Sequence, residues 1–236
     1  PPPLARATEL CKSDLVSEMI KDGKEFTKLE GFIGARYAEH AGESPQTCRI
    51  MERYYLPRSA AGELPGDLPS SVLAIADRLD TIAGCWKAGF APTGAKDPYA
   101  LRRHVLAVIR ILLDLQLRLD LEAALNRAWE ALAAYASPAG GGDRAELMDF
   151  VQTRLSGYLM ETLPVDPAVI RAVVPVRWRD PADARRWCEA LQTYRTEADF
   201  QLLATGFKRC RNILKGQVLP VAELDACLER WLSGGA

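Results

Sequence analysis

Residues 84–113 read GCWKAGFAPTGAKDPYALRRHVLAVIRILL. The first part is a loop, stiffened by Pro92 and punctuated by glycines, and it ends at Asp97 and Pro98. Asp followed by Pro is typical of a helix start, because the carboxylate accepts otherwise unpaired amide protons and proline has none to donate. We therefore expect a core helix from about Pro98. Its buried face should hold apolar residues at helical spacing, namely Leu101, Val105, Val108, Ile109 and Leu112.

Composition is typical of a globular protein of one or two domains. The chain has 236 residues, of which 48% are hydrophobic and 26% charged, and its formal net charge is -1. Any nucleic-acid contact must therefore come from a local basic patch. Six cysteines without a CxxC pair, and only two histidines, disfavour a structural zinc site and indicate reduced thiols. No apolar run approaches the roughly 20 residues of a membrane span.

The rest of the chain predicts helices throughout, so we expect an all-α fold. Apolar spacing and caps favour helices over residues 4–21, 26–40 and 46–55, one capped by Ser70 or Ser71, and one after Asp120. Residues 138–142 are the clearest break. We interpret residues 173–178, a run with three valines that Pro175 interrupts, as a linker. A helical hairpin should follow over 181–195 and 199–215, its inner face holding Leu203, Phe207, Cys210 and Leu214, with a last helix from Pro220.

Four short segments carry a resemblance to a known family. They read PTGAKDPYALRR at 92–103, LAIADRLDT at 73–81, CKSDLV at 11–16 and YLPR at 55–58. Together they resemble the beta subunit of bacterial two-subunit glycyl-tRNA synthetase. The resemblance implies that residues 1–175 form a helical domain related to the HD superfamily. Residues 176–236 would be the opening helices of an incomplete anticodon-binding-like domain, through EALQ at 189–192 and FKRCRNIL at 207–214, so the chain would be part of a longer subunit.

The HD superfamily is named for a His-Asp doublet that holds a divalent metal able to activate water. Ser13 precedes Asp14 where the doublet needs histidine, and Ala41 follows His40 where it needs an acid. Asp77 lies where the superfamily's last aspartate would fall. We therefore interpret Asp14, His40 and Asp77 as vestigial positions and expect no metal and no catalytic residue, with His104 beyond reach of any motif. Helix geometry places Asp80 at the edge of the apolar face and Asp77 toward solvent, where such acids usually pair with an arginine or cap a helix.

Two basic segments are candidates for RNA contact. The loop before the central helix could cradle phosphate at a helix N-terminus, but Asp97 is placed to satisfy those amides and no GKS/T ending follows. We expect it to shape a surface, with Lys96, Arg102 and Arg103 as possible contacts to RNA backbone. The second segment has no acid between Phe200 and Val221, and its candidates are Lys208, Arg209, Arg211 and Lys215.

The family resemblance implies a function in glycine-tRNA ligation. The chain would help to bind and position glycine tRNA for an alpha subunit that activates glycine. ATP and magnesium would be used there, so we expect no cofactor in this chain and no adenylation chemistry of its own. We also expect a cytoplasmic protein without membrane contact. Two alternatives stay open: a divergent metal-dependent HD phosphohydrolase, and a purely architectural module that docks against the other subunit.

Overall fold

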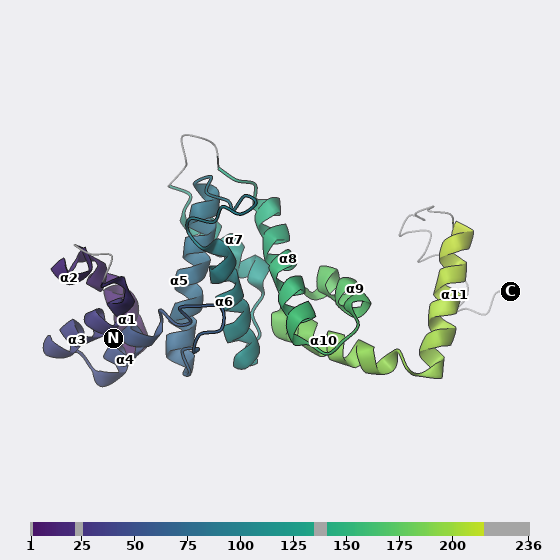
Figure 1. Cartoon of the computed structure of the whole chain (residues 1–236), viewed down its shortest axis with the longest axis horizontal. Coiled ribbons are helices and arrows are strands. Elements are labelled where there is room, and N and C mark those ends of the chain that lie inside the picture. The colour runs from purple at the N-terminus through teal and green to yellow at the C-terminus, as the bar shows by residue number, and fades with distance from the viewer. Residues whose placement is uncertain (1, 22–25, 135–140, 215–236) are drawn as a thin grey trace, which may run out of the picture. The chain divides into compact units, whose positions relative to one another are not determined.

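A computed structural model describes residues 2–21, 26–134 and 141–214 (Figure 1). The chain divides into two compact units, residues 1–188 and 189–236. The regular elements of the described residues are all helical, which confirms the all-α prediction. They are α1 (Pro3–Leu10), η1 (Ser13–Val16), α2 (Glu18–Lys21), η2 (Thr27–Leu29), α3 (Phe32–His40), α4 (Pro45–Arg53), α5 (Leu68–Lys87), α6 (Leu101–Asp114), α7 (Leu121–Ala131), α8 (Arg144–Thr162), α9 (Pro167–Arg177), α10 (Pro181–Tyr194) and α11 (Ala198–Leu214).

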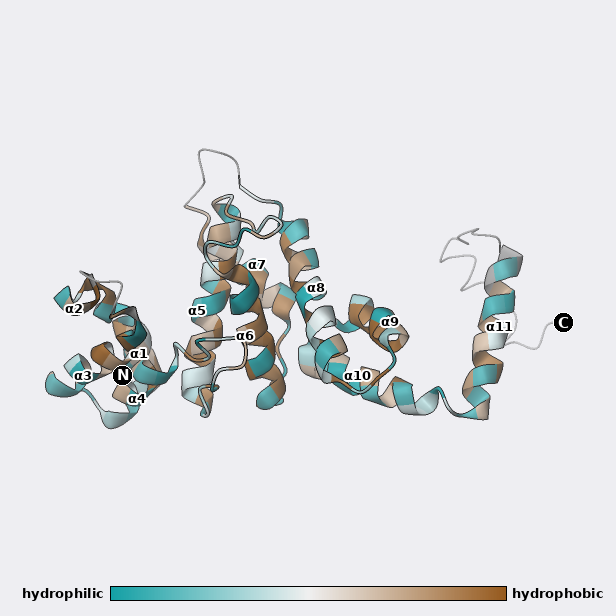
Figure 2. Ribbon diagram, in the orientation of Figure 1, coloured by the Kyte–Doolittle hydropathy of each residue, from teal (hydrophilic) through white to brown (hydrophobic). Residues whose placement is uncertain are grey.

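The core of the first unit forms where α5 packs on α6 and α7, and α8 packs on α6 and α9. The face predicted for α6 is buried, because none of Leu101, Val105, Val108, Ile109 and Leu112 is more than 2% exposed. Figure 2 shows how apolar this helix is. Burying one large aliphatic side chain is worth about 1.5–3 kcal/mol. The central helix is therefore a main source of the unit's stability.

The start of α6 differs from the prediction by three residues. The helix begins at Leu101 rather than Pro98, because Ala100 adopts a left-handed conformation with φ of 54°. The Asp97 carboxylate still accepts from the helix, through the amides of Leu101 at 2.8 Å and Arg102 at 3.0 Å. The chain thus makes a turn over residues 97–100 before the helix begins. Asp97 therefore caps the helix from the far side of this turn, and Pro98 is not the first residue of the helix.

Two further helix starts were predicted, and one is wrong. The cap of α5 is Asp67, whose side chain accepts from the Ser70 amide at 2.9 Å. Ser70 and Ser71 are buried within the helix instead of preceding it. Asp120 caps α7 as predicted, accepting from the Ala123 amide at 2.9 Å. Both real caps are aspartates with extended backbone, which is the conformation that an N-cap needs.

The N-terminal segments are more broken than their periodicity indicated. Residues 4–21 form α1, η1 and α2, with Lys12 in a left-handed conformation after α1. Residues 26–40 form η2 and α3, separated at Gly31, where φ is +75°. The prediction for residues 46–55 is confirmed by α4, which Ser44 caps at the Thr47 amide. A long-range hydrogen bond from the Gly31 amide to Asp14, at 2.6 Å, joins the two interrupted segments.

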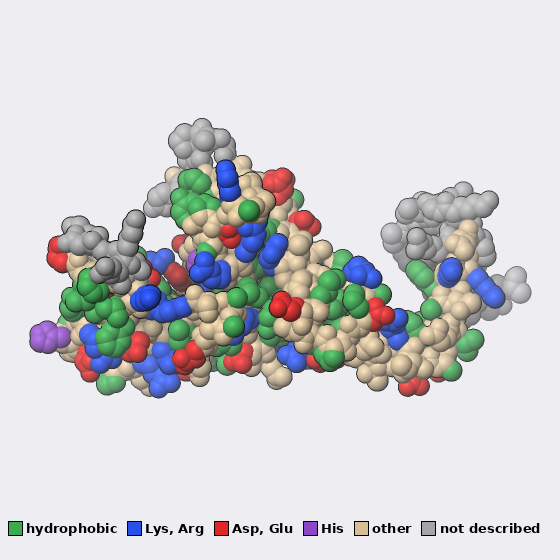
Figure 3. All heavy atoms as spheres, in the orientation of Figure 1, with side chains coloured by type: hydrophobic (Ala, Val, Ile, Leu, Met, Phe, Trp, Pro, Cys, Tyr) green, Lys and Arg blue, Asp and Glu red, His purple; other side chains and the backbone are tan. Residues whose placement is uncertain are grey.

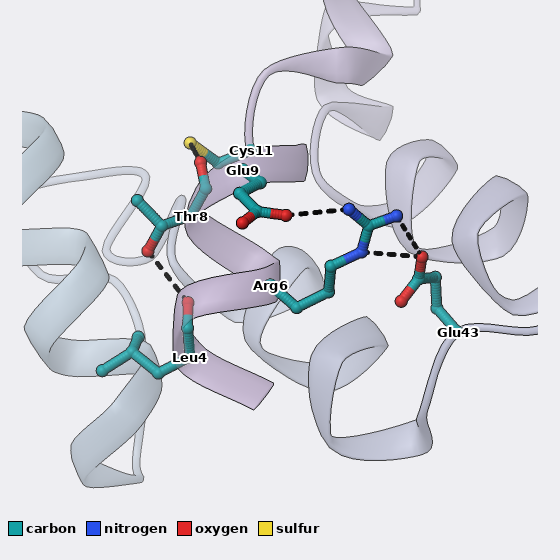
Figure 4. A network of polar contacts seen from close by, with 6 residues as sticks. All are labelled: Leu4, Arg6, Thr8, Glu9, Cys11 and Glu43. Atoms are coloured by element: carbon teal, nitrogen blue, oxygen red, sulfur yellow. Dashed lines mark hydrogen bonds and ion pairs between the residues drawn. The ribbon is translucent and has the colours of Figure 1, made fainter. Parts of the chain in front are cut away.

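Arg6 ties α1 to the turn before α4 (Figure 4). Its guanidinium donates to Glu43 Oε1 from Nε at 2.9 Å and from Nη2 at 2.7 Å, and to Glu9 at 2.8 Å. The fork shape of the guanidinium suits this shared arrangement. Beside it, Thr8 Oγ1 donates to the Leu4 carbonyl and Cys11 Sγ to the Thr8 carbonyl. The network fixes the register of α1 against the loop that leads into α4.

The linker predicted at residues 173–178 is wrong, since most of it belongs to α9. Val173 and Val174 are buried with Val169 and Ile170, and α9 packs against α8. Pro175 lies inside the helix and removes one amide donor from its last turn, and the helix ends two residues later. The domain boundary at residue 175 stays a prediction.

The helices predicted over residues 181–195 and 199–215 correspond to α10 and α11. The predicted inner face of α11 is not buried: Leu203 and Phe207 are 68% and 70% exposed, and Cys210 is also exposed. Residues 138–140 and the helix expected from Pro220 lie outside the described residues. The same limit applies to the end of the predicted helix 199–215, at Lys215.

Candidate functional site

Two cavities lie beside the N-terminal end of α6, and Ala100 and Arg103 line both of them. The first, which we call the polar pocket, has a volume of about 260 Å³. Its walls come from α5, α6, Glu30 and the segment that follows α4. The second, which we call the arginine groove, has a volume of about 610 Å³ and lies between α6 and α8. Arg102, Arg103 and Arg154 line it.

Arg78 is the buried cation of the polar pocket, and it is 4% exposed. Its guanidinium donates to four carbonyls: Tyr54 and Ala74 at 3.0 Å, Tyr55 at 2.8 Å and Pro57 at 3.3 Å. Among the described residues no carboxylate accepts from it, and burial lowers the pKa of Arg78. Arg78 thus links α5 to the segment after α4, which forms another wall of the pocket. Its place on the apolar face, four residues from Ala74 and Ile82, was a sequence signal that our prediction missed.

Asp77 lies beside Arg78 and accepts from Lys12 Nζ at 2.6 Å. Its side chain is only 15% exposed, whereas Asp80 is exposed, so the predicted placement of these two acids is reversed. The expectation that Asp77 pairs with a cation is confirmed, but the partner is a lysine. That lysine follows α1 and adopts a left-handed backbone conformation. The ion pair therefore depends on the break between α1 and η1.

His104 lines the same pocket as Asp77, so the prediction that it lies beyond reach of the motifs is wrong. Its Nδ1 is buried without a hydrogen-bond partner in the described part of the chain. Burial lowers the pKa of His104, and the charge of Arg78 lowers it further. The imidazole is therefore neutral at pH 7. Helix packing between α5 and α6 brings the two residues together.

The lowered pKa of His104 predicts a loss of stability in acid. The unfolded chain binds a proton near pH 6.5, while the folded chain resists it until a lower pH. The contribution of His104 to the free energy of unfolding is therefore fully present above about pH 7, and it decreases as the pH falls below 6.5. We expect wild type to lose more unfolding free energy than His104→Gln between pH 7.5 and 5.5 in urea titrations. Equal losses would contradict the prediction.

The three vestigial positions, Asp14, His40 and Asp77, have different surroundings in the structure. Asp14 is 2% exposed and accepts from the Gly31 amide at 2.6 Å and from the Tyr55 hydroxyl at 3.3 Å. His40 is exposed at the C-terminal end of α3. Asp77 is engaged by Lys12. No group of three or more His, Cys, Asp or Glu able to hold a metal ion occurs within residues 2–21, 26–134 and 141–214.

The three candidate RNA-binding residues near the start of α6 differ in whether their side chains already have polar partners. Lys96 is exposed and pairs through its backbone with Thr93. Arg102 donates to the Gly94 carbonyl at 2.7 Å and lies 3.8 Å from Asp97, so its charge serves its own loop. Arg103 is exposed, and no acceptor for its side chain occurs among the described residues. Of the three, Arg103 is best placed to meet a ligand.

Arg154 of α8 is a groove residue that sequence reasoning missed. Its guanidinium lies over the Phe150 ring, 5.6 Å from the centroid, and its Nε is buried without a partner in the described part of the chain. Tyr158 and Glu161 lie on the same wall. Figure 3 shows lysine and arginine side chains gathered over the region of α5, α6 and α8. The groove is thus a local basic surface on a chain whose net charge is -1.

The second basic segment lies on α11, in the unit of residues 189–236. Lys208 and Arg209 are exposed there. Arg211 belongs to the same helix, and Lys215 lies outside the described residues. These four residues stay candidates for RNA contact.

Comparison with known proteins identifies the family. Residues 3–175 match the family described as glycyl-tRNA synthetase beta subunit. Similar proteins include the glycine-tRNA ligase beta subunits of Syntrophotalea carbinolica, 39% identical over 214 residues, Geobacter sulfurreducens, 37% over 214, and Pseudomonas aeruginosa strain UCBPP-PA14, 40% over 210. These alignments cover 90%, 91% and 89% of this chain.

The helical fold and these matches place the chain among the aminoacyl-tRNA synthetase proteins. It belongs to the glycyl-tRNA synthetase beta subunit family. The chain spans about 30% of the length of the relatives it matches. None of the helices in the described residues is long and apolar enough to cross a membrane.

Proposed function

We propose that this chain helps to bind and position glycine tRNA within a two-subunit glycine-tRNA ligase. An alpha subunit would be its protein partner and would activate glycine with ATP and magnesium. This chain would contribute no adenylation chemistry, and it would act in the cytoplasm. The observation that carries the proposal is the family match over residues 3–175. That match favours neither a metal-dependent phosphohydrolase nor a purely architectural module.

The arginine groove supports a role in holding RNA. Arg103 and Arg154 contribute guanidinium groups from two different helices, and neither is neutralised by an ion pair with a described residue. A duplex or a strand of RNA presents regularly spaced phosphates, and arginine binds phosphate through two parallel hydrogen bonds. Tyr158 adds an aromatic group to the same wall. Such contacts would position RNA without reading its sequence.

Binding to glycine tRNA and to an unrelated tRNA, each measured by fluorescence anisotropy across a salt titration, tests this proposal. We expect the affinity to fall steeply with salt, and the double variant Arg103→Gln, Arg154→Gln to bind at least about tenfold more weakly, because a hydrogen bond to a charged group is worth about 1.5–3 kcal/mol. The salt slope should also become shallower, by about 0.7–0.9 for each phosphate that the variant no longer neutralises.

Arg127→Gln is the matched control, because Arg127 is an exposed arginine on α7 outside both cavities. It should leave tRNA affinity within about twofold, as expected for one distant exposed charge. A separate Lys208→Gln, Arg209→Gln variant tests the second basic segment. Absence of binding to either tRNA at low salt would overturn the proposal and favour the architectural module. Preference for glycine tRNA would show that recognition resides in this chain.

A further inference from the structure

The polar pocket is a site that tRNA positioning leaves unexplained. It shares only Ala100 and Arg103 with the arginine groove, and its other walls come from different elements. Arg58 follows α4, Arg78 lies in α5, and Arg103 and His104 lie in the first turn of α6. Three separate segments of the first unit therefore place cationic or imidazole groups around one small cavity.

Positive charges outnumber negative charges among the residues that line this pocket. Its lining carries three cations, Arg58, Arg78 and Arg103, and two carboxylates, Glu30 and Asp77, which leaves a formal charge of +1. Lys12, which binds Asp77, and Asp14, which accepts from the Tyr55 hydroxyl, lie just outside the lining and together leave this sum unchanged. Arg58 donates to the backbone carbonyl of Glu30 rather than to its carboxylate, and stacks 5.5 Å from the Tyr55 ring centroid. The carboxylates thus leave the three guanidinium groups without a direct anionic partner among the described residues.

His104 adds an unsatisfied polar atom to this positive surface. Its Nδ1 is buried and lacks a partner in the described part of the chain. An unpaired buried polar atom costs about 1–3 kcal/mol. The atom is closed to solvent in this conformation, so a bound group recovers that cost only when the imidazole ring turns toward the cavity. Native proteins keep few such atoms, and each is a reason to look for a ligand.

The volume of the pocket limits what it can hold. Sites for small organic molecules usually have volumes of about 300–1,000 Å³. A cavity of about 260 Å³ is below that range and suits one phosphoryl group, with the remainder of the molecule outside. A phosphate monoester carries between one and two negative charges near pH 7, which is opposite in sign to the local charge of +1. Its oxygens can accept from two guanidinium groups at once.

We propose that the polar pocket binds the terminal phosphate of a phosphate monoester. Arg58 and Arg103 are the groups that pair with its oxygens, and the His104 ring, which lines the cavity, turns to supply a hydrogen bond. Arg78 remains on its four carbonyls and acts as a fixed positive charge beneath the ligand. The interaction is binding only, and no bond is made or broken. The proposal does not depend on the binding of tRNA in the arginine groove.

Isothermal titration calorimetry at low salt tests this site on the whole chain. The ligands are inorganic phosphate, adenosine 5′-monophosphate, and adenosine as the partner without phosphate. We expect both phosphates to bind and adenosine not to bind. A short RNA with a 5′-phosphate, compared with the same RNA ending in a 5′-hydroxyl, distinguishes a phosphate at an RNA end from a free one. Equal binding of adenosine and its monophosphate would overturn the proposal.

Variants assign the binding to the polar pocket. We expect Arg58→Gln and His104→Gln each to weaken binding of the monophosphate by about tenfold or more, as for loss of a hydrogen bond to a charged group. Arg154→Gln, which changes only the groove, should leave monophosphate binding unchanged. Circular dichroism and urea unfolding identify any variant that fails to fold, and two independent variants keep the test decisive. Unchanged affinity in both folded variants would overturn the proposal, even if tRNA binding responds to Arg154.

Discussion

Replacing Arg78 by methionine is expected to lower the free energy of unfolding by about 3 kcal/mol or more. Methionine retains much of the side-chain volume but has no donor for the carbonyls of Tyr54, Tyr55 and Pro57. Each buried acceptor left unpaired costs about 1–3 kcal/mol, while removal of the buried charge recovers part of the loss. The measurement is equilibrium unfolding in urea, at a pH where both proteins are folded.

Two companion variants test the reason for this loss. Arg78→Lys keeps the charge but cannot reach all four carbonyls with the fork geometry of a guanidinium, so its loss should be intermediate. Arg127→Met removes an exposed arginine and should change the free energy of unfolding by no more than about 0.5 kcal/mol. A loss below about 1 kcal/mol for Arg78→Met would show that the carbonyls find other partners.

Replacing Asp14 by alanine is the second change with a large expected effect, a loss of about 2–4 kcal/mol in the free energy of unfolding. The buried Gly31 amide and the Tyr55 hydroxyl would lose their acceptor. The Gly31 backbone lies close against Tyr55, since a Cβ there would lie 2.6 Å from Tyr55 Cδ2, so it has little room to shift toward another acceptor. Urea unfolding measures this loss directly.

Asp14→Asn separates the hydrogen bond from the charge. Its side-chain oxygen can still accept from the Gly31 amide, so we expect less than half of the loss seen with alanine. Asp149→Ala, on the exposed side of α8, is the control and should change stability by about 0.5 kcal/mol or less. Similar losses in Asp14→Ala and Asp149→Ala would contradict the structural role assigned to Asp14.

Local patterns predicted the features that depend on neighbouring residues. The buried face of α6 followed from apolar spacing, and the cap at Asp120 from residue type. The broken N-terminal segments did not follow, because they are held by contacts such as the bond between Asp14 and Gly31, 17 residues apart in the chain. The prediction for the start of α6 was wrong because Ala100 adopts a left-handed conformation. The alanine side chain gives no sign of this conformation in the sequence.

The site was predictable only in part. Arg103 was a candidate from the sequence because it is a basic residue at the end of the family-like segment, and the structure leaves it exposed beside two cavities. His104 and Arg154 were not recognised, because their surroundings arise from packing of α6 against α5 and α8. Arg78 could have been found, since a charged residue at an inward position of an apolar helix demands an explanation.

The four carbonyl bonds of Arg78 also have a dynamic consequence. They join the segment from Tyr54 to Pro57 to α5, so this wall of the polar pocket cannot swing outward as a lid without breaking buried bonds. Its backbone should therefore open only in the slow, large-scale fluctuations that expose α5 itself. A small anion would enter a preformed cavity through its open side, and association would not wait for a conformational gate.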